Sequence, residues 1–335
     1  MADRRIAVTF VHGVEISNPD YAKNGAAMLK AAFTRHAGRA ADDALVIKPV
    51  YWAEHVEELE DKLYRACFRP PSTKLFHMLS YLATQIDAGQ SYAVVPLLLS
   101  AGLRQVPVPG IRTPNYPTLR WVVTQYLGDA IAYQQSANDR VLYDKIHGKL
   151  ADVIRALGKE AGPDAPLCVI SHSLGTVIAS NYLYDLQVQY GGSGARQLIA
   201  PQVERCIQAT PLEHGQTLAL FYTLGSPIPL WTMRFAEFGV PLTVPSPLLH
   251  AHHPNVAGEW INFYDPDDLV AHPLRGLSER YRQHVTEDRK VSVGPWWLGW
   301  TPLSHFSYWN DHAVINPIAR SLARAWRQLT NNTRE

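Results

Sequence analysis

The chain has 335 residues, of which 47% are hydrophobic and 18% charged, and its formal net charge is +1. This length suits one large α/β domain with insertions or two modest domains, and the hydrophobic fraction is normal for a protein with a full buried core. A net charge so close to zero excludes a general electrostatic attraction to nucleic acid. The three scattered cysteines are too few for a disulfide framework or a zinc site.

The first part of the chain alternates strand-like and helix-like patterns. A strand is predicted over residues 5–11, a helix over 21–36 and a second strand over 44–52. Such alternation is typical of βαβ units and predicts a parallel sheet. Residues 53–118 break the pattern, and we interpret them as a helical cap inserted over an active site, although ordinary packing helices explain them equally well. This region contains two predicted helices, residues 54–67 and 74–88.

The longest apolar stretch, residues 92–103, contains a proline and is too short to cross a bilayer. It either packs inside the protein, touches a membrane surface or covers an apolar pocket. The N-terminus leads directly into the first strand without the long apolar segment of a secretory signal. We therefore expect a cytoplasmic protein whose membrane contact, where it has one, is peripheral and made through the cap.

Strands and helices alternate again in the second part of the chain, which shows no internal repeat. The predicted elements are helices over 118–136 and 139–157, strands over 217–224, 260–264 and 290–293, a proline-rich loop over 227–258 and a closing helix over 311–329. We read residues 1–335 as a single α/β domain with a mostly parallel central sheet flanked by helices.

The most informative motif is Ser171-His172-Ser173-Leu174-Gly175, which follows the apolar run Leu167–Ile170. A buried strand that ends in small-x-Ser-x-Gly and runs into a helix is the pattern of a nucleophile elbow, a sharp turn that presents one serine hydroxyl to a ligand. Ser173 is therefore the candidate nucleophile. Ser171 stands where glycine is usual, and an ordinary strand-to-helix turn is the alternative.

A serine hydroxyl needs a base, and the base needs an orienting acid. In proteins with this elbow, the acid follows the serine along the chain and the histidine comes last. Asp265, Asp267 and Asp268 follow the strand predicted over 260–264. We prefer Asp268 because the Leu269-Val270 pair after it can anchor the loop in the core; Asp265 is second and Asp267 third. Any of the three could instead cap a turn.

Among 14 histidines, His305 is the best candidate for the base because it follows the last predicted strand and precedes the closing helix. His284 and His312 are alternatives in less suitable positions. Acyl transfer also needs donors for an oxyanion. The backbone N–H groups of Leu174, after the nucleophile, and Val14, after His12-Gly13, are the candidates.

These residues together resemble the α/β-hydrolase family. The resemblance spans nearly the whole chain and is carried by His12-Gly13, the elbow 171–175, Asp268 and His305. The His-Ser-Leu-Gly elbow and the Thr-Leu-Gly-Ser-Pro segment 223–227 are similar to lipases and esterases. Residues 262–271 also resemble a stretch of DDHD-type phospholipases, which places the acid at Asp268, although Leu269 stands where that pattern has proline.

The resemblance implies an α/β-hydrolase fold, within which residues 53–118 are the region that we interpret as a cap. It implies a serine hydrolase that forms an acyl-enzyme and uses no metal and no organic cofactor. The cap and a cluster of tryptophans, Trp296, Trp297 and Trp300, favour apolar or lipid-like esters, although core packing explains the cluster equally well. Acyl transfer, thioester or amide cleavage, and a hydrolase-like scaffold that binds a partner without turnover are the alternatives.

Overall fold

The computed structural model describes residues 4–14, 18–67, 128–135, 140–191, 196–295 and 302–331. The chain divides into two compact units, one formed by residues 1–13, 20–51 and 144–335 and the other by residues 14–19 and 52–143. Several predicted features lie outside the described residues: the helix over 74–88, the apolar stretch 92–103, most of the helix over 118–136, and the tryptophans between residues 296 and 300.

The first unit contains a six-stranded sheet with the order β2-β1-β3-β4-β5-β6, in which every neighbouring pair is parallel. Its strands are β1 (Ile6–Val11), β2 (Leu45–Val50), β3 (Leu167–His172), β4 (Leu218–Leu224), β5 (Glu259–Tyr264) and β6 (Glu287–Lys290). The three central strands β1, β3 and β4 are buried along their whole length. Parallel strands covered on both faces read as continuous apolar runs for this reason. The predicted α/β class and parallel sheet are thus confirmed.

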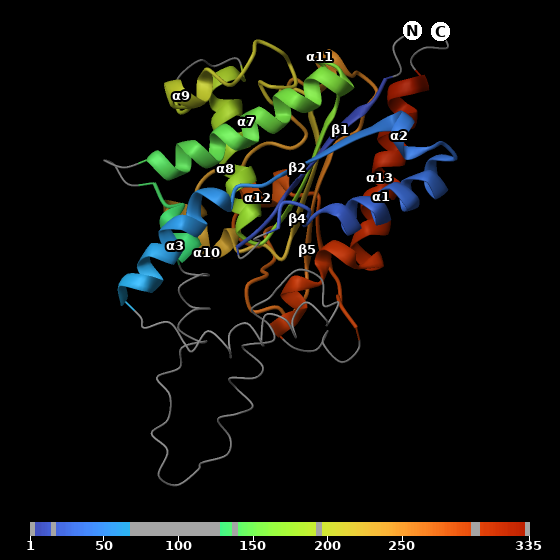
Figure 1. The fold of residues 1–335 in the computed structure, drawn as a ribbon. Helices are drawn as coiled ribbons and strands as arrows, with labels where there is room; N and C mark the ends of the chain where they lie inside the picture. Colours follow the sequence, from blue (N-terminus) through green and yellow to red (C-terminus); the bar gives the residue numbers. More distant parts are fainter. Residues whose placement is uncertain are drawn as a thin grey trace. The chain divides into compact units, whose positions relative to one another are not determined.

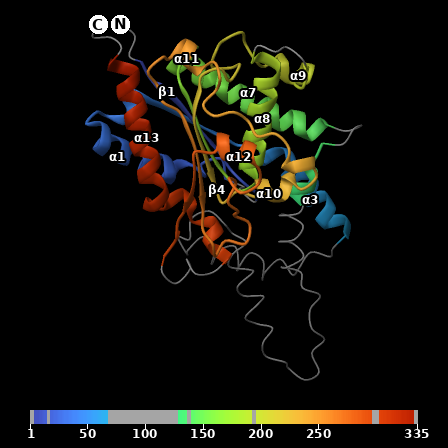
Figure 2. The ribbon, with the colours of Figure 1, turned by 180° about the vertical axis from the view of Figure 1, so that it is seen from behind.

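Helices cover both faces of this sheet (Figure 1). On one face α1 (Lys23–Ala37) packs along α13 (His312–Asn331). The opposite face carries α7 (Val141–Ala161) and α8 (Leu174–Tyr190), and the reverse view in Figure 2 shows the same two layers. Most of α8 is buried against the sheet, and it begins directly after β3. The strand and helix that flank the predicted elbow are therefore consecutive in the structure.

The last strand differs from its prediction. We expected residues 290–293, whereas β6 covers Glu287–Lys290 and pairs with β5 at the edge of the sheet. Its residues are all charged, which suits an exposed edge strand because charge opposes pairing with another molecule. The apolar Val291 and Val293 that suggested a strand are buried just beyond its end.

The segment predicted as a loop over 227–258 contains α10 (Ile228–Thr232), the 3₁₀ helix η2 (Ala236–Phe238) and α11 (Leu249–His252). Each has at most five residues, too few to show helical periodicity in a sequence. The other short helices of the described residues are α2 (Ala41–Ala44), α9 (Pro201–Glu204), α12 (Glu279–His284), η3 (Pro302–Phe306) and η4 (Tyr308–Asn310).

In the second unit, α3 (Glu54–Cys67) has the bounds of the charged helix predicted there. Leu59 and Leu63 of α3 are about half exposed, whereas Trp52 just before it is fully buried. Within the part of the chain that the structure describes, no helix combines the length and the apolar character that crossing a membrane requires.

Candidate active site

The candidate residues lie at the carboxyl ends of three neighbouring strands of the sheet. Ser173 directly follows β3, Gly225 directly follows β4, and Asp268 lies four residues after β5. Parallel strands end at the same edge, so the loops that follow them meet there. His305 joins this group from η3, which precedes α13.

The turn at Ser173 has the conformation of a sharp elbow. Its φ is 53° and its ψ is −132°, a region that a residue with a side chain rarely adopts. The backbone N–H of Ser173 donates to the carbonyl of Leu224 on the neighbouring strand, and its own carbonyl accepts from the N–H and hydroxyl of Thr176. Such strain persists only where the surrounding structure fixes it, and these bonds fix the serine in place.

Two glycines permit the close approach of the β1 loop to this turn. A Cβ at Gly175 would collide with the carbonyl oxygens of Val11 and His12, and a Cβ at Gly13 would lie 2.5 Å from the Cβ of Ser173. The glycine after the serine is therefore required by backbone packing against β1, and the glycine of His12-Gly13 by packing against the serine itself.

Substituting Gly175 by alanine should lower the free energy of unfolding by about 2–3 kcal/mol, because two backbone carbonyls of the central sheet would have to move. Gly148, inside α7, provides the control, since a Cβ there meets nothing within 4 Å. Gly148→Ala should stabilise the protein by up to about 1 kcal/mol through helix propensity. Urea unfolding measures both; equal shifts would contradict the packing argument.

His305 bridges Ser173 and Asp268. Its Nε2 lies 2.8 Å from the Oγ of Ser173, and its Nδ1 lies 2.7 Å from the Oδ2 of Asp268. The carboxylate can only accept, so Nδ1 carries the proton and donates it to Asp268. The unprotonated Nε2 then accepts from the hydroxyl of Ser173. Both side chains of the His305–Asp268 hydrogen bond are almost fully buried.

Asp268 is held by four donors. Its Oδ1 accepts from the backbone N–H groups of Val270 and Ala271, at 2.8 and 3.3 Å. Its Oδ2 accepts from His305 and from the hydroxyl of Tyr308, the latter at 3.0 Å. Burial by itself would raise the pKa of this carboxyl, but the donors outweigh burial and hold the pKa below its ordinary value. Asp268 is thus a carboxylate at neutral pH.

The other two aspartates of this loop have different positions. Asp265 is fully buried, and its carboxylate accepts from the N–H groups of Asp267 and Val293, which closes the loop after β5. Asp267 is exposed. The structure therefore brings only Asp268 to His305. The anchoring that we predicted for the Leu269-Val270 pair is wrong for Leu269, which is 75% exposed, whereas Val270 is half-buried.

Two residues of the site were not identified from the sequence. Tyr308 accepts from the N–H of Asp265 at 2.8 Å while it donates to Asp268, so it links the two ends of the acidic loop. His172 donates its Nε2–H to the carbonyl of His305 at 2.7 Å, and the two rings lie 4.8 Å apart. Tyr308 lies one 3₁₀ turn after His305, and His172 directly precedes Ser173. Their closeness in sequence to these two candidates is the feature from which they could have been identified.

Both buried histidines near the elbow are neutral. Burial lowers the pKa of His172 to about 3 despite its bond to His305. Burial likewise lowers the pKa of His12 to about 3, although its Nδ1–H donates to the carbonyl of Gly13 at 2.7 Å. The ring of His12 also contacts that of Tyr21 edge-on. His12 therefore stiffens the turn that approaches Ser173 and carries no charge there.

The two predicted oxyanion donors, the N–H groups of Leu174 and Val14, belong to different units of the chain. Leu174 begins α8, so its N–H is one of the groups that a helix leaves unbonded at its N-terminus, where the helix dipole favours negative charge. Val14 adjoins Gly13 but belongs to the second unit, so its role stays a prediction.

The alternative histidines lie elsewhere. His284 ends α12, and the exposed His312 begins α13, whereas the position opposite Ser173 is taken by His305.

Among the described residues no group of three or more histidines, cysteines and carboxylates is arranged to hold a metal ion. In comparisons with protein-family models, curated proteins and solved structures, the chain matched none.

Proposed function

We propose that this chain is a serine hydrolase of the α/β-hydrolase fold that cleaves carboxylic esters, with Ser173, His305 and Asp268 as its catalytic triad. The observation that carries the proposal is the unbroken hydrogen-bond chain from the Ser173 hydroxyl through His305 to Asp268. Hydrolytic sites with these roles recur on unrelated folds, so the arrangement of the three groups is the relevant criterion. The strained turn at Ser173 supports the same assignment.

In this mechanism the Oγ of Ser173 attacks the acyl carbonyl carbon and its proton passes to Nε2 of His305. The N–H group of Leu174, at the start of α8, stabilises the negative oxygen of the tetrahedral intermediate, and the N–H group of Val14 stays the predicted second donor. The carbon–oxygen bond to the alcohol then breaks, and the alcohol leaves with the proton from His305. Water repeats these steps on the acyl-serine and restores the enzyme. Asp268 holds His305 in the productive tautomer and stabilises its cation.

Labelling with a fluorophosphonate probe tests the proposal directly, because only an activated serine reacts rapidly with it. We expect the intact mass of the wild-type protein to increase by one label and that of Ser173→Ala to stay unchanged. Circular dichroism of both proteins controls for folding. A folded wild type that takes up no label, or equal labelling of the two proteins, contradicts the proposal and favours the scaffold that binds without turnover.

A further inference from the structure

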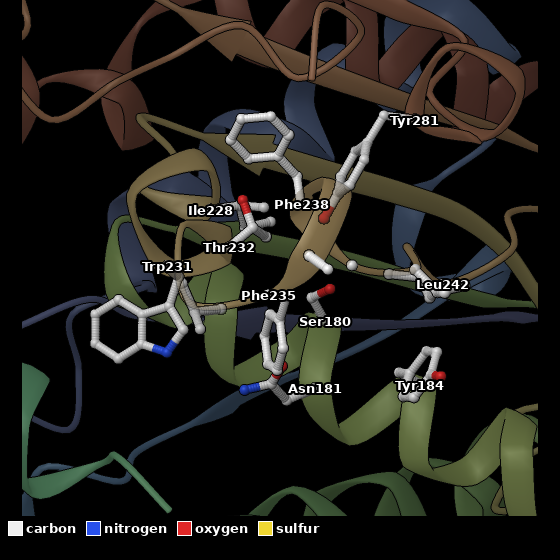
Figure 3. Close-up of a pocket in the computed structure, with 14 residues that line it drawn as sticks. Ser180, Asn181, Tyr184, Ile228, Trp231, Thr232, Phe235, Phe238, Leu242 and Tyr281 are labelled. Carbon is white, nitrogen blue, oxygen red and sulfur yellow. The ribbon is translucent and has the colours of Figure 1, made fainter. Parts of the chain in front are cut away.

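A pocket of about 390 Å³ lies along the exposed side of α8, in the first unit (Figure 3). One wall is the stripe Val177, Ser180, Asn181 and Tyr184, whose spacing places these residues on one face of α8. The opposite wall is the segment 228–242, which contains α10 and η2, and Tyr281 of α12 adds a further side. The volume is within the range of small-molecule sites.

The lining of this pocket is uncharged. The described residues that form it are aliphatic, aromatic, hydroxyl or amide residues, and the aromatic ones are Tyr184, Trp231, Phe235, Phe238 and Tyr281. A carboxylate or phosphate would find no cation among the lining residues to offset the loss of its hydration, and the guanidinium of Arg234 lies over the ring of Phe235, 4.8 Å from its centroid. A neutral, mainly hydrocarbon ligand fits this chemistry.

The segment that forms the outer wall leaves unusual apolar surface in contact with solvent. Met233, Phe235 and Val240 are 72%, 50% and 53% exposed, and Leu230 and Phe238 are also exposed. These five lie within eleven consecutive residues. A concentrated apolar patch around a pocket marks a surface that binds something apolar.

The stripe of α8 that lines the pocket begins one helical turn after the proposed nucleophile, although Ser173, His305 and Asp268 do not themselves line the pocket. Val177 lies one helical turn after Ser173, a distance of about 6 Å along the axis of α8. Between them the hydroxyls of Thr176 and Ser226 are hydrogen bonded at 2.8 Å, and Ser226 also accepts from the N–H of Ile228, which lines the pocket. From Val177 to Tyr184 the stripe extends about 10 Å farther from Ser173.

We propose that this pocket binds the hydrocarbon chain of the ester substrate. The proposal rests on the ester hydrolysis proposed above and specifies its substrate: an ester with a chain long enough to extend from Ser173 past the Thr176–Ser226 pair to the level of Ser180. The uncharged lining, the exposed apolar rim and the single turn that separates the pocket from Ser173 carry this assignment.

Filling the pocket tests the proposal. The ratio of kcat/KM for nitrophenyl decanoate to that for nitrophenyl acetate should fall by at least about tenfold in Ser180→Phe, since each lost methylene contact changes discrimination by about that factor. Val188→Phe adds the same ring farther along α8, beyond the pocket, and should keep the wild-type ratio. Ala236→Phe, at an exposed position of the rim, should act like Ser180→Phe and serves if the latter does not fold.

Binding without turnover separates this proposal from the hydrolase proposal. Folded Ser173→Ala should enhance the fluorescence of N-phenylnaphthylamine, decanol should reverse the enhancement, and Ser173→Ala with Ser180→Phe should show neither effect. If Ser180→Phe and Ala236→Phe both kept the wild-type ratio of kcat/KM for the decanoate to that for the acetate, the assignment of the pocket to the substrate would be overturned. Ester hydrolysis itself would remain established. A third outcome is also informative. If fluorophosphonate does not label the wild type, but Ser180→Phe abolishes binding of the fluorescent probe, the pocket is an apolar site and its role as a substrate site is overturned.

Discussion

Replacing Asp268 by asparagine should lower kcat for ester hydrolysis by about 10⁴-fold, even though the new side chain has almost the same shape. The reason lies in the two backbone donors at Oδ1. The N–H groups of Val270 and Ala271 require an acceptor there, so the amide oxygen of asparagine will occupy that side and its NH₂ group will replace Oδ2.

The NH₂ group then faces Nδ1 of His305 and donates to it. This reverses the direction of the hydrogen bond that is 2.7 Å long in the structure, and it forces the imidazole proton onto Nε2. A protonated Nε2 cannot accept the hydroxyl proton of Ser173. The loss should therefore appear in kcat, with fluorophosphonate labelling slowed by a similar factor, while KM changes little.

The neighbouring aspartates provide matched controls. Asp267→Asn should keep the wild-type kcat, because Asp267 is exposed and its backbone N–H, which bonds to Asp265, is unaltered. Asp265→Asn should lower the melting temperature more than kcat, since its amide NH₂ would confront the N–H of Asp267 or of Val293. If Asp265→Asn instead showed the large loss of kcat and Asp268→Asn did not, the assignment of the acid would be wrong.

The sequence predicted those elements that local pattern determines. The strands β1, β3, β4 and β5 and the helices α1, α3, α7 and α13 were identified to within a few residues, because continuous apolar runs and long amphipathic stretches have a clear periodicity. The order of Ser173, Asp268 and His305 along the chain then selected three residues that the structure brings within hydrogen-bonding distance.

The parts that the sequence did not predict depend on long-range contacts. Nothing local to Asp268 indicates that a tyrosine 40 residues later donates to it, and the neighbouring Leu269, apolar in sequence, turned out to be exposed. The charged strand β6 lacks an apolar pattern because it pairs on one side only. The pocket along α8 joins segments from residues 177 to 281, and its outer wall was predicted as an irregular loop.

His172 should prove to be a positioning residue for His305. It ends β3, a buried strand, and its Nε2–H donates to the backbone carbonyl of His305, so it ties the segment η3 to the rigid sheet. His172→Leu removes the donor and leaves that carbonyl buried without it, and we expect kcat to fall about 10²-fold because a misplaced base loses its alignment with Ser173. His172→Gln should recover most of this loss, since its amide nitrogen reaches roughly the place of Nε2.

A purely structural role for His172 makes a different prediction. It would lower the melting temperature of both variants and leave kcat per folded molecule unchanged. The low-field proton resonance of His305 Nδ1–H distinguishes the two without substrate, because it reports the bond to Asp268. We expect this resonance to shift or disappear in His172→Leu and to return in His172→Gln, in parallel with kcat; an unperturbed resonance in His172→Leu would contradict the positioning role. Since burial lowers the pKa of His172 to about 3, His172 stays neutral, and the ratio of kcat in the wild type to kcat in His172→Leu should not change with pH between about 5 and 8.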